Sequence, residues 1–357
     1  MPTNFRIASF NVENLFSRAR VLNLADHEKV GQLLIEISKL NALIAKPTYS
    51  AADKAAIKQL VADLSYYIEI REDRGKLLSL AGNVTASGRD AWDGVIELRR
   101  AGISEQARTA TADVIKALKA DVLCVVEAEN RPSLEQFNSQ LLSTKKFPHV
   151  LVIDGNDDRG IDVGLMTKLA LGSIHTHVYD RAGSRPIFSR DCLRVELQKL
   201  PNGKPLHILC NHLKSKGYGD QADNDRKRTA QTTRIAKILA ENYNLATDYV
   251  LVAGDMNDTP NLPPMQPLLT VPHLHDALAL GIPNAADRWT YRYDGRGNQI
   301  DYLLISEPLK QVFVKSGIER RGIWGIQAVT GETAFPSVTA KKHAASDHGA
   351  VWAEFRF

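Results

Sequence analysis

The sequence predicts an α/β protein with large β-sheets and a separate helical region. Short apolar runs rich in Val and Ile recur along most of the chain, and such runs are typical of strands. Helical periodicity between them, clearest over 104–119 and 225–242, favours a mixed α/β body. From about 26 to 82, apolar residues instead repeat only at three- and four-residue steps, which predicts helices without strands.

The apolar runs differ in how they are expected to be covered. The run 193–197 alternates apolar and polar residues, which predicts one buried face. The run 249–253 is apolar throughout, which predicts a central strand covered on both faces. The expected strands are 7–12, 122–126, 150–153, 163–166, 193–197, 206–210, 249–253, 289–293, 300–305, 311–314 and 350–355.

The helical region is expected to form a hairpin of two helices. Pro47 separates its two periodic segments, and Ser50 followed by Asp53 is typical of a cap that starts a helix. The glycine-containing stretch 82–102 predicts a looped return. We therefore expect one catalytic domain over 1–357 with a helical-hairpin insertion over 26–102. The insertion either stabilises the main fold or acts as an arm that grips substrate or a second copy.

Composition excludes several classes of protein. Of 357 residues, 44% are hydrophobic and 24% are charged, a globular balance that rules out a disordered or fibrous chain. No apolar run approaches the ~18 residues of a membrane helix, so no stable membrane association is expected. No secretory signal is recognisable, which favours the cytoplasm, or secretion if a leader has been removed. Cys124, Cys192 and Cys210 lie in apolar stretches and are expected to be buried free thiols.

Positive charge is concentrated in one stretch. The net charge of the chain is +4, while 204–237 contains eight Lys or Arg residues against three Asp. A local cationic patch on a near-neutral body suits a polyanionic ligand. The alternative is a solvated helix face without a partner.

Six short segments combine an apolar strand with polar residues at one end: IASFNVEN, VLCVVEAEN, ILCNHLKS, VLVAGDMN, IDYLLIS and ASDHGAVWAEF. The polar residues follow the strand in the first four segments and precede it in the last two. If the last two strands run antiparallel to the others, all six clusters meet at one edge of the sheets. The residues concerned are Asn11, Glu13, Glu127, His212, Asp255, Asn257, Asp301, Asp347 and His348.

Five of these residues carry carboxyl groups, and like charges at one edge cannot all ionise without compensation. A hard divalent cation supplies it, and oxygen ligands from carboxylates and amides suit Mg²⁺ or Mn²⁺ rather than zinc. His212 and His348 are candidates for proton transfer, because imidazole titrates near neutral pH. The combination predicts metal-assisted hydrolysis, most naturally of a phosphate ester.

Five motifs, in this order, resemble the endonuclease/exonuclease/phosphatase family, which includes pancreatic deoxyribonuclease and the abasic-site repair nucleases. The motifs are FNVEN at 10–14, VVEAEN at 125–130, GDMND at 254–258, IDYLL at 300–304 and SDH at 346–348. RGIDVGLM at 159–166 and NHLKSKG at 211–217 resemble a bacterial nuclease branch of that family. The resemblance covers 5–16 and about 104–357. It implies a four-layered α/β sandwich of two mixed sheets with helices outside.

The resemblance also implies a metal site for Mg²⁺, with Mn²⁺ as a substitute. Glu127 resembles the principal metal ligand, with Asn11 and Glu13 beside it. Many family members have Asp at the position of Glu13, so this chain departs from the family pattern there. Asp347 is expected to hold or orient the same site.

The catalytic roles come from the same resemblance. His348, held by Asp301, is expected to polarise the attacking water, and Asp255 lies close to the same water. Asn257 is expected to hydrogen-bond a phosphoryl oxygen. His212 is expected either to stabilise the transition state or to help protonate the leaving oxygen.

A nucleic acid is the expected substrate, with DNA favoured and both endo- and exonucleolytic cleavage open. Arg159, Asn211, Lys214 and Lys216 are the candidate contacts to it. The alternative is the same chemistry on a phospholipid, an inositol phosphate or a small nucleotide. A non-catalytic binding module on this fold would require losses among the key residues, and the sequence shows none.

Overall fold

The computed structural model describes residues 4–13, 17–23, 27–102, 104–157, 159–217 and 220–357. They form two compact units, one built mainly from 17–102 and the other from the segments before and after it. Two residues of the sequence predictions lie outside the described residues: Asp26, the expected first residue of the insertion, and Asn14, the last residue of the FNVEN motif. Among the described helices, none is both long enough and apolar enough to cross a membrane.

The larger unit contains two mixed sheets of six strands each. In the first, β1 runs parallel to β6 and antiparallel to β20. Its spatial order is β19 (Phe313–Glu319), β20 (Ala350–Arg356), β1 (Asn4–Asn11), β6 (Val122–Ala128), β8 (Asp162–Thr167) and β7 (His149–Ile153).

In the second sheet, β13 runs parallel to β14, and β14 runs antiparallel to β18. Its spatial order is β15 (Leu274–Asp276), β18 (Asp301–Ser306), β14 (Val250–Asp255), β13 (Leu206–His212), β12 (Cys192–Leu197) and β9 (Leu171–His175).

The core of this unit lies between the two sheets. Alternate residues of each central strand point inward, such as Cys124 of β6 and Leu251 of β14. Their neighbours Leu123 and Val252 point outward to helices. Because both faces of these strands are covered, they are apolar throughout, as expected for the run 249–253. The three cysteines are buried free thiols, as predicted.

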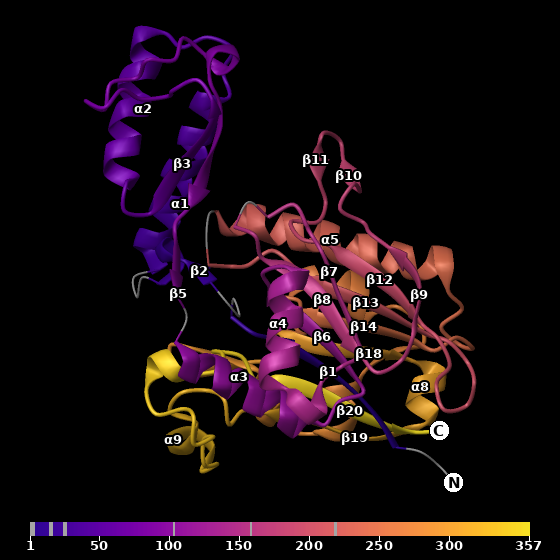
Figure 1. Cartoon of the computed structure of the whole chain (residues 1–357). Helices are drawn as coiled ribbons and strands as arrows, with labels where there is room; N and C mark the ends of the chain where they lie inside the picture. The colour runs from indigo at the N-terminus through magenta and orange to yellow at the C-terminus, as the bar shows by residue number, and fades with distance from the viewer. Residues whose placement is uncertain (1–3, 14–16, 24–26, 103, 158, 218–219) are drawn as a thin grey trace. The chain divides into compact units, whose positions relative to one another are not determined.

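Helices cover the outer faces of both sheets (Figure 1). On the first sheet lie α3 (Glu105–Leu118) and α4 (Arg131–Leu141), through residues such as Ile115 and Phe137. On the second lies α5 (Gln221–Asn242), through Ile235 and Leu239. The four-layered α/β sandwich with two mixed sheets is thereby confirmed.

Shorter elements connect these layers. They are the helices α6 (Gln266–Leu269), α7 (Ala277–Gly281), α8 (Glu307–Gln311) and α9 (Ile326–Thr330), and the strand pairs β10 (Arg181–Ala182) with β11 (Arg185–Pro186) and β16 (Tyr291–Tyr293) with β17 (Arg296–Asn298). The expected strands 289–293 and 311–314 are shorter or shifted, because β16 begins at Tyr291 and α8 extends to Gln311 before β19.

The smaller unit combines a helical hairpin with two strand pairs. The hairpin is α1 (His27–Ile44) followed by α2 (Ala51–Leu64), and Ser50 and Asp53 form the expected capping box at the start of α2. The strand pairs are β2 (Ser17–Ala19) with β5 (Arg100–Gly102) and β3 (Ile68–Arg74) with β4 (Asp93–Leu98). Leu40, Ile57 and Trp92 are buried in its own core.

The prediction of helix alone from 26 to 82 is wrong beyond Leu64. Ile68 and Ile70 alternate with the charged residues Glu69 and Arg71, a two-residue period that places the isoleucines on the covered face of β3. The stretch 82–102, expected as a loop, supplies the partner strand β4.

Candidate active site

The polar ends of the central strands meet, as the sequence pattern predicts. β1 and β6 end in the same direction, as do β13 and β14, whereas β18 and β20 begin there. Asn11 Nδ2, at the end of β1, donates to Asp255 Oδ2 at 3.1 Å and to Glu127 Oε1 at 3.3 Å. Because Asp255 ends a strand of the other sheet, one site is built from both sheets.

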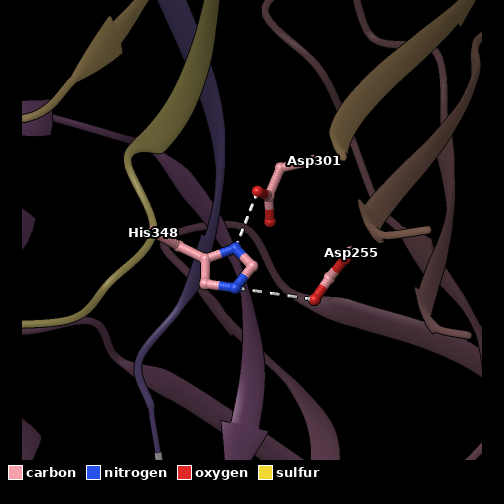
Figure 2. Close-up of side chains that lie close together, drawn as sticks. All are labelled: Asp255, Asp301 and His348. Carbon is pink, nitrogen blue, oxygen red and sulfur yellow. Dashed lines mark hydrogen bonds and ion pairs between the residues drawn. The ribbon is translucent and has the colours of Figure 1, made fainter. Parts of the chain in front are cut away.

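His348 lies between two buried carboxylates (Figure 2). Its Nδ1 is 2.8 Å from Asp301 Oδ2, and its Nε2 is 3.9 Å from Asp255 Oδ2. Burial disfavours the imidazolium form, but the negative charges of Asp301 and Asp255 outweigh it and raise the pKa of His348 well above its usual value. The ring is therefore held in place by Asp301, and the carboxylates on either side favour its protonated form.

Asp255 is 1% exposed and lies directly opposite Asp301 on the neighbouring strand. Its Oδ1 accepts from the backbone N of Asn257 at 2.8 Å. Burial, together with the charges of Asp301 and Glu127, raises the pKa of Asp255 to about 7. The site therefore contains a carboxyl group that keeps its proton up to near neutral pH unless positive charge is added.

His212 faces the same carboxylates from β13. Its Nε2 lies 3.7 Å from Asp255 Oδ2 and 3.8 Å from Glu127 Oε1, and the residue is 3% exposed. Burial and the positive charges of Arg190 and Arg159 lower its pKa well below the usual value. The pKa values of the two histidines are therefore shifted in opposite directions, which favours the neutral form of His212 and the protonated form of His348.

Three of the expected site residues have left-handed backbone conformations. Glu13 has φ of 49°, Glu127 of 67° and Asn257 of 54°. For non-glycine residues this region costs roughly 1–3 kcal/mol and is concentrated at functional sites. Glu127 is also the extra residue of a β-bulge, because the register between β6 and β8 shifts between Val126 and Ala128. A bulge redirects a side chain.

Asp347 and Glu13 lie at the outer side of the site. Glu13 Oε2 accepts from the backbone N of Asp347 at 3.1 Å. The Asp347 side chain is 52% exposed, and its Oδ1 lies 3.8 Å from His348 Nε2. Asn11 Oδ1 accepts from the backbone N of Glu13 at 3.1 Å, so this amide links the residues expected to form the metal site.

The donor set fits a hard divalent cation. Within the described residues, Asp255, Asp301 and His348 are the one group of three His, Cys, Asp or Glu whose ligand atoms all lie within 4.8 Å of one another. Glu13, Glu127 and Asp347 do not reach this spacing. Mg²⁺ needs only one or two carboxylates, because waters and substrate phosphate complete its shell. The carboxylate of Glu127 beside the crowded Asp255 therefore suits it, and Asn11 holds both carboxylates through its Nδ2.

Of the four residues expected to contact the substrate, Lys214 and Arg159 lie among other charged groups near His212. Lys214 is half-buried, and burial with the nearby charges of Arg159 and Arg190 lowers its pKa to about 8. Arg159 forms a two-pronged ion pair with Asp157, at 2.8 and 2.7 Å. The positive charge of Arg159 also lowers the pKa of His212.

Two of the expected contacts have structural partners. Lys216 Nζ lies 2.5 Å from Oδ1 of the fully buried Asp258. Asn211 is fully buried, and its Nδ2 donates to Leu209 O at 3.0 Å. The contact of Lys216 joins the loop after β13 to the loop after β14, and that of Asn211 lies within β13.

The basic stretch 204–237 is largely neutralised within the chain. Its ion pairs join Lys216 to Asp258, Arg226 to Asp223, Arg228 to Asp225 and Asp258, Arg234 to Asp180 and Glu241, and Lys237 to Glu241. Five of its eight Lys and Arg residues thus have acidic partners within the chain.

Arg190 is a site residue that the sequence analysis missed. It is 2% exposed, and its guanidinium contacts Asp157 Oδ2 at 2.9 Å and Leu213 O at 3.3 Å. Burial lowers the pKa of Arg190, while the charges of Asp157, Glu127 and Asp255 oppose that change. The only sequence signal was its place just before β12, among the loops at this edge.

Solved structures with the same fold come from several organisms. An AP endonuclease from Archaeoglobus fulgidus is 17% identical with a TM-score of 0.52, covering 71% of this chain and 95% of the other. A family protein from Bacteroides thetaiotaomicron is 12% identical with a TM-score of 0.52, covering 100% and 99%. A humanised D. rerio TDP2 is 13% identical with a TM-score of 0.50, covering 70% and 91%. No curated protein sequence matches the chain.

Fold and site together define a class of protein: a four-layered α/β sandwich with carboxylates and two histidines where its sheets meet. The chain belongs to the endonuclease/exonuclease/phosphatase family, whose model matches residues 100–348. Members of this family are phosphoester hydrolases that generally depend on a divalent metal.

Proposed function

We propose that this protein is a divalent-metal-dependent phosphodiesterase that hydrolyses nucleic acid, with DNA as the favoured substrate and Mg²⁺ or Mn²⁺ as its cofactor. The observation that carries the proposal is His348, fixed by Asp301 and facing Asp255, beside the Glu127–Asn11 pair. This arrangement supplies oriented proton-transfer groups next to oxygen ligands.

Glu127 would hold the cation, with Asn11 beside it and Glu13 and Asp347 at its outer side. When bound, the cation supplies positive charge that stabilises the phosphoryl oxygens in the transition state. Asp255, ionised once the charge of the cation lowers its pKa, would take a proton from the attacking water. His348 would polarise and orient that water, and Asp301 fixes which ring nitrogen faces it.

His212 has the chemistry of a hydrogen-bond donor. A neutral imidazole, which its lowered pKa indicates, is a poor acid but can donate from Nε2 to a phosphoryl oxygen. Of the two roles expected for His212, we therefore favour transition-state stabilisation over protonation of the leaving oxygen.

Cations beside the carboxylates support a phosphate-bearing polymer as substrate. Arg190 and Arg159 raise the positive potential around Lys214, and Arg190 and Arg185 do the same around Lys227. Crowded cations bind an anion favourably for the same reason that crowded carboxylates bind a metal ion. Several such cations suit a substrate with more than one phosphate.

The test is a cleavage assay on plasmid DNA, single-stranded DNA, RNA and phospholipid vesicles with Mg²⁺, Mn²⁺ or chelator. We expect metal-dependent cleavage of DNA, and His348→Asn should lower kcat by at least ~100-fold, as loss of a general acid or base does. His175→Asn, which changes an exposed histidine of β9, serves as the matched control.

Two outcomes would contradict the proposal. Absence of cleavage of every nucleic acid under each metal would refute the nuclease function. Hydrolysis of the lipid headgroup with intact DNA would keep the chemistry and replace the substrate with the alternative class.

A further inference from the structure

The loop after β13, residues 213–216, is held by other parts of the chain at each of its first four backbone polar groups. Leu213 N donates to Asp255 O at 2.9 Å, and Leu213 O accepts from Asn257 Nδ2 at 3.1 Å. Lys214 N donates to Gln231 Oε1 at 2.9 Å, and Lys214 O accepts from Arg228 Nη1 at 2.9 Å. The backbone of Lys214 is therefore held on both sides by α5.

Arg228 and Gln231 are three residues apart on one face of α5, and both are 0% exposed. Arg228 Nε also lies 3.1 Å from Oδ2 of Asp258, which is likewise fully buried. Asp258 in turn accepts from Lys216 Nζ, and its backbone O accepts from Tyr302 at 2.8 Å. One buried network thus joins α5, the loop after β13 and the loop after β14.

These residue types are poor choices for stability alone. A buried ion pair is often no more stabilising than apolar residues of similar volume. Gln231 Nε2 is buried, and within the described residues nothing accepts a hydrogen bond from it. An unsatisfied buried amide destabilises a fold, so a residue that carries one suggests another requirement.

We propose that Arg228 and Gln231 are positioning residues, which fix the backbone of Lys214 so that its ammonium group contacts a phosphate of the substrate. The inference rests on the proposed function, because it assigns that site a phosphate contact. It explains why both polar groups of the Lys214 backbone are bound by buried side chains, two residues after His212.

Gln231→Leu removes the acceptor of the Lys214 amide at nearly constant volume and also removes the unsatisfied Nε2. We expect the variant to fold and to lose roughly 10- to 100-fold in kcat/KM on DNA, as misplacement of a binding group does. The variant should also lose about one phosphate contact in DNA binding. The slope of log K against log salt concentration should then become less steep by about 0.9 on duplex DNA. A purely structural role would not change that slope.

Lys214→Gln provides the coupling test. In the Lys214→Gln background, adding Gln231→Leu should change kcat/KM by less than about twofold, since both changes remove one contact. Thr232→Val is the matched control, because Thr232 is the next residue of α5, is 0% exposed and donates to Pro264 O at 2.6 Å rather than to this loop. It should keep wild-type kcat/KM and salt slope.

Hydrogen exchange of the Lys214 amide separates the possible failures. The amide should be protected in the wild type and in Thr232→Val and should exchange faster in Gln231→Leu. The inference would be overturned if Gln231→Leu keeps the wild-type kcat/KM and salt slope, or if the effects of Gln231→Leu and Lys214→Gln multiply in the double variant. In either case, cleavage by the wild type would preserve the proposed function. A wild type that cleaves no nucleic acid would instead overturn the proposed function and the inference with it.

Discussion

Replacing Asp255 by asparagine is expected to stabilise the metal-free protein while abolishing its activity. The carboxyl group is buried opposite Asp301 and close to Glu127, and these neighbours raise its pKa from 3.8 to about 7. The unfolded chain loses this proton near pH 4, whereas the folded chain keeps it until near pH 7. Ionised Asp255 therefore destabilises the folded state increasingly as pH rises from about 4 to 7.

The size of the effect follows from the shift. It spans about three pKa units, each equivalent to about 1.4 kcal/mol, which gives an upper limit of about 4 kcal/mol above pH 7. The Asp255→Asn variant would weaken or lose the hydrogen bond that Asn11 donates to this side chain, a cost of about 1 kcal/mol. The free energy of unfolding should therefore rise by about 1–3 kcal/mol at pH 8.

The assay is urea unfolding in chelator at pH 8 and pH 4.5. The stabilisation by Asp255→Asn should be present at pH 8 and nearly absent at pH 4.5. Added Mn²⁺ should stabilise the wild type more than the variant. An Asp255→Asn variant that is less stable than wild type at pH 8, or a difference independent of pH, would refute the reasoning.

Asp157→Asn is the control of opposite sign. Although burial opposes it, the hydrogen bonds and charges of Arg159 and Arg190 lower the pKa of Asp157 to about 2. Its ionised form stabilises the folded state above pH 4, and that stability is lost as pH falls towards 2. Asp157→Asn should therefore lower the free energy of unfolding at pH 8.

Further changes test other parts of the structure. Arg228→Met removes one of the two cationic partners of the buried Asp258 and should cost up to about 3–5 kcal/mol in urea unfolding, whereas Arg228→Met with Asp258→Asn should cost less; equal costs would contradict the pairing. Gly254→Ala should disrupt the site, because Gly254 has φ of 132° and a Cβ there would lie 1.9 Å from Asn211 O; wild-type unfolding and cleavage would count against this. Mn²⁺ affinity measured by calorimetry should weaken below pH 7 as Asp255 takes up a proton, and an affinity that does not change with pH would argue against the raised pKa.

Much of the larger unit could be predicted from the sequence. Polar residues at one end of an apolar strand indicate the direction of the strand as well as its position. The prediction that Asn11, Glu127, Asp255 and His348 meet therefore required only that the strands form mixed sheets. The pairing of His348 with Asp301 came from the family resemblance, and the hydrogen bond of 2.8 Å agrees with it.

What the sequence could not predict depends on contacts distant along the chain or on backbone geometry. Nothing local indicates that Glu127 lies in a bulge at positive φ, or that Arg190 is buried beside it. Net charge alone could not show that Lys216 lies against Asp258. In β3 a two-residue period was missed because its first residue, Ile68, also continues the spacing of α2.

Direct measurement of Mn²⁺ binding, by calorimetry or electron paramagnetic resonance, tests the central claim. The chelator-treated wild type should bind Mn²⁺ and cleave DNA, Glu127→Gln should lose both, and His348→Asn should keep the ion while losing cleavage. If Glu127→Gln binds Mn²⁺ as the wild type does, or if the wild type binds none, the assignment of this edge as a metal-dependent active site is contradicted.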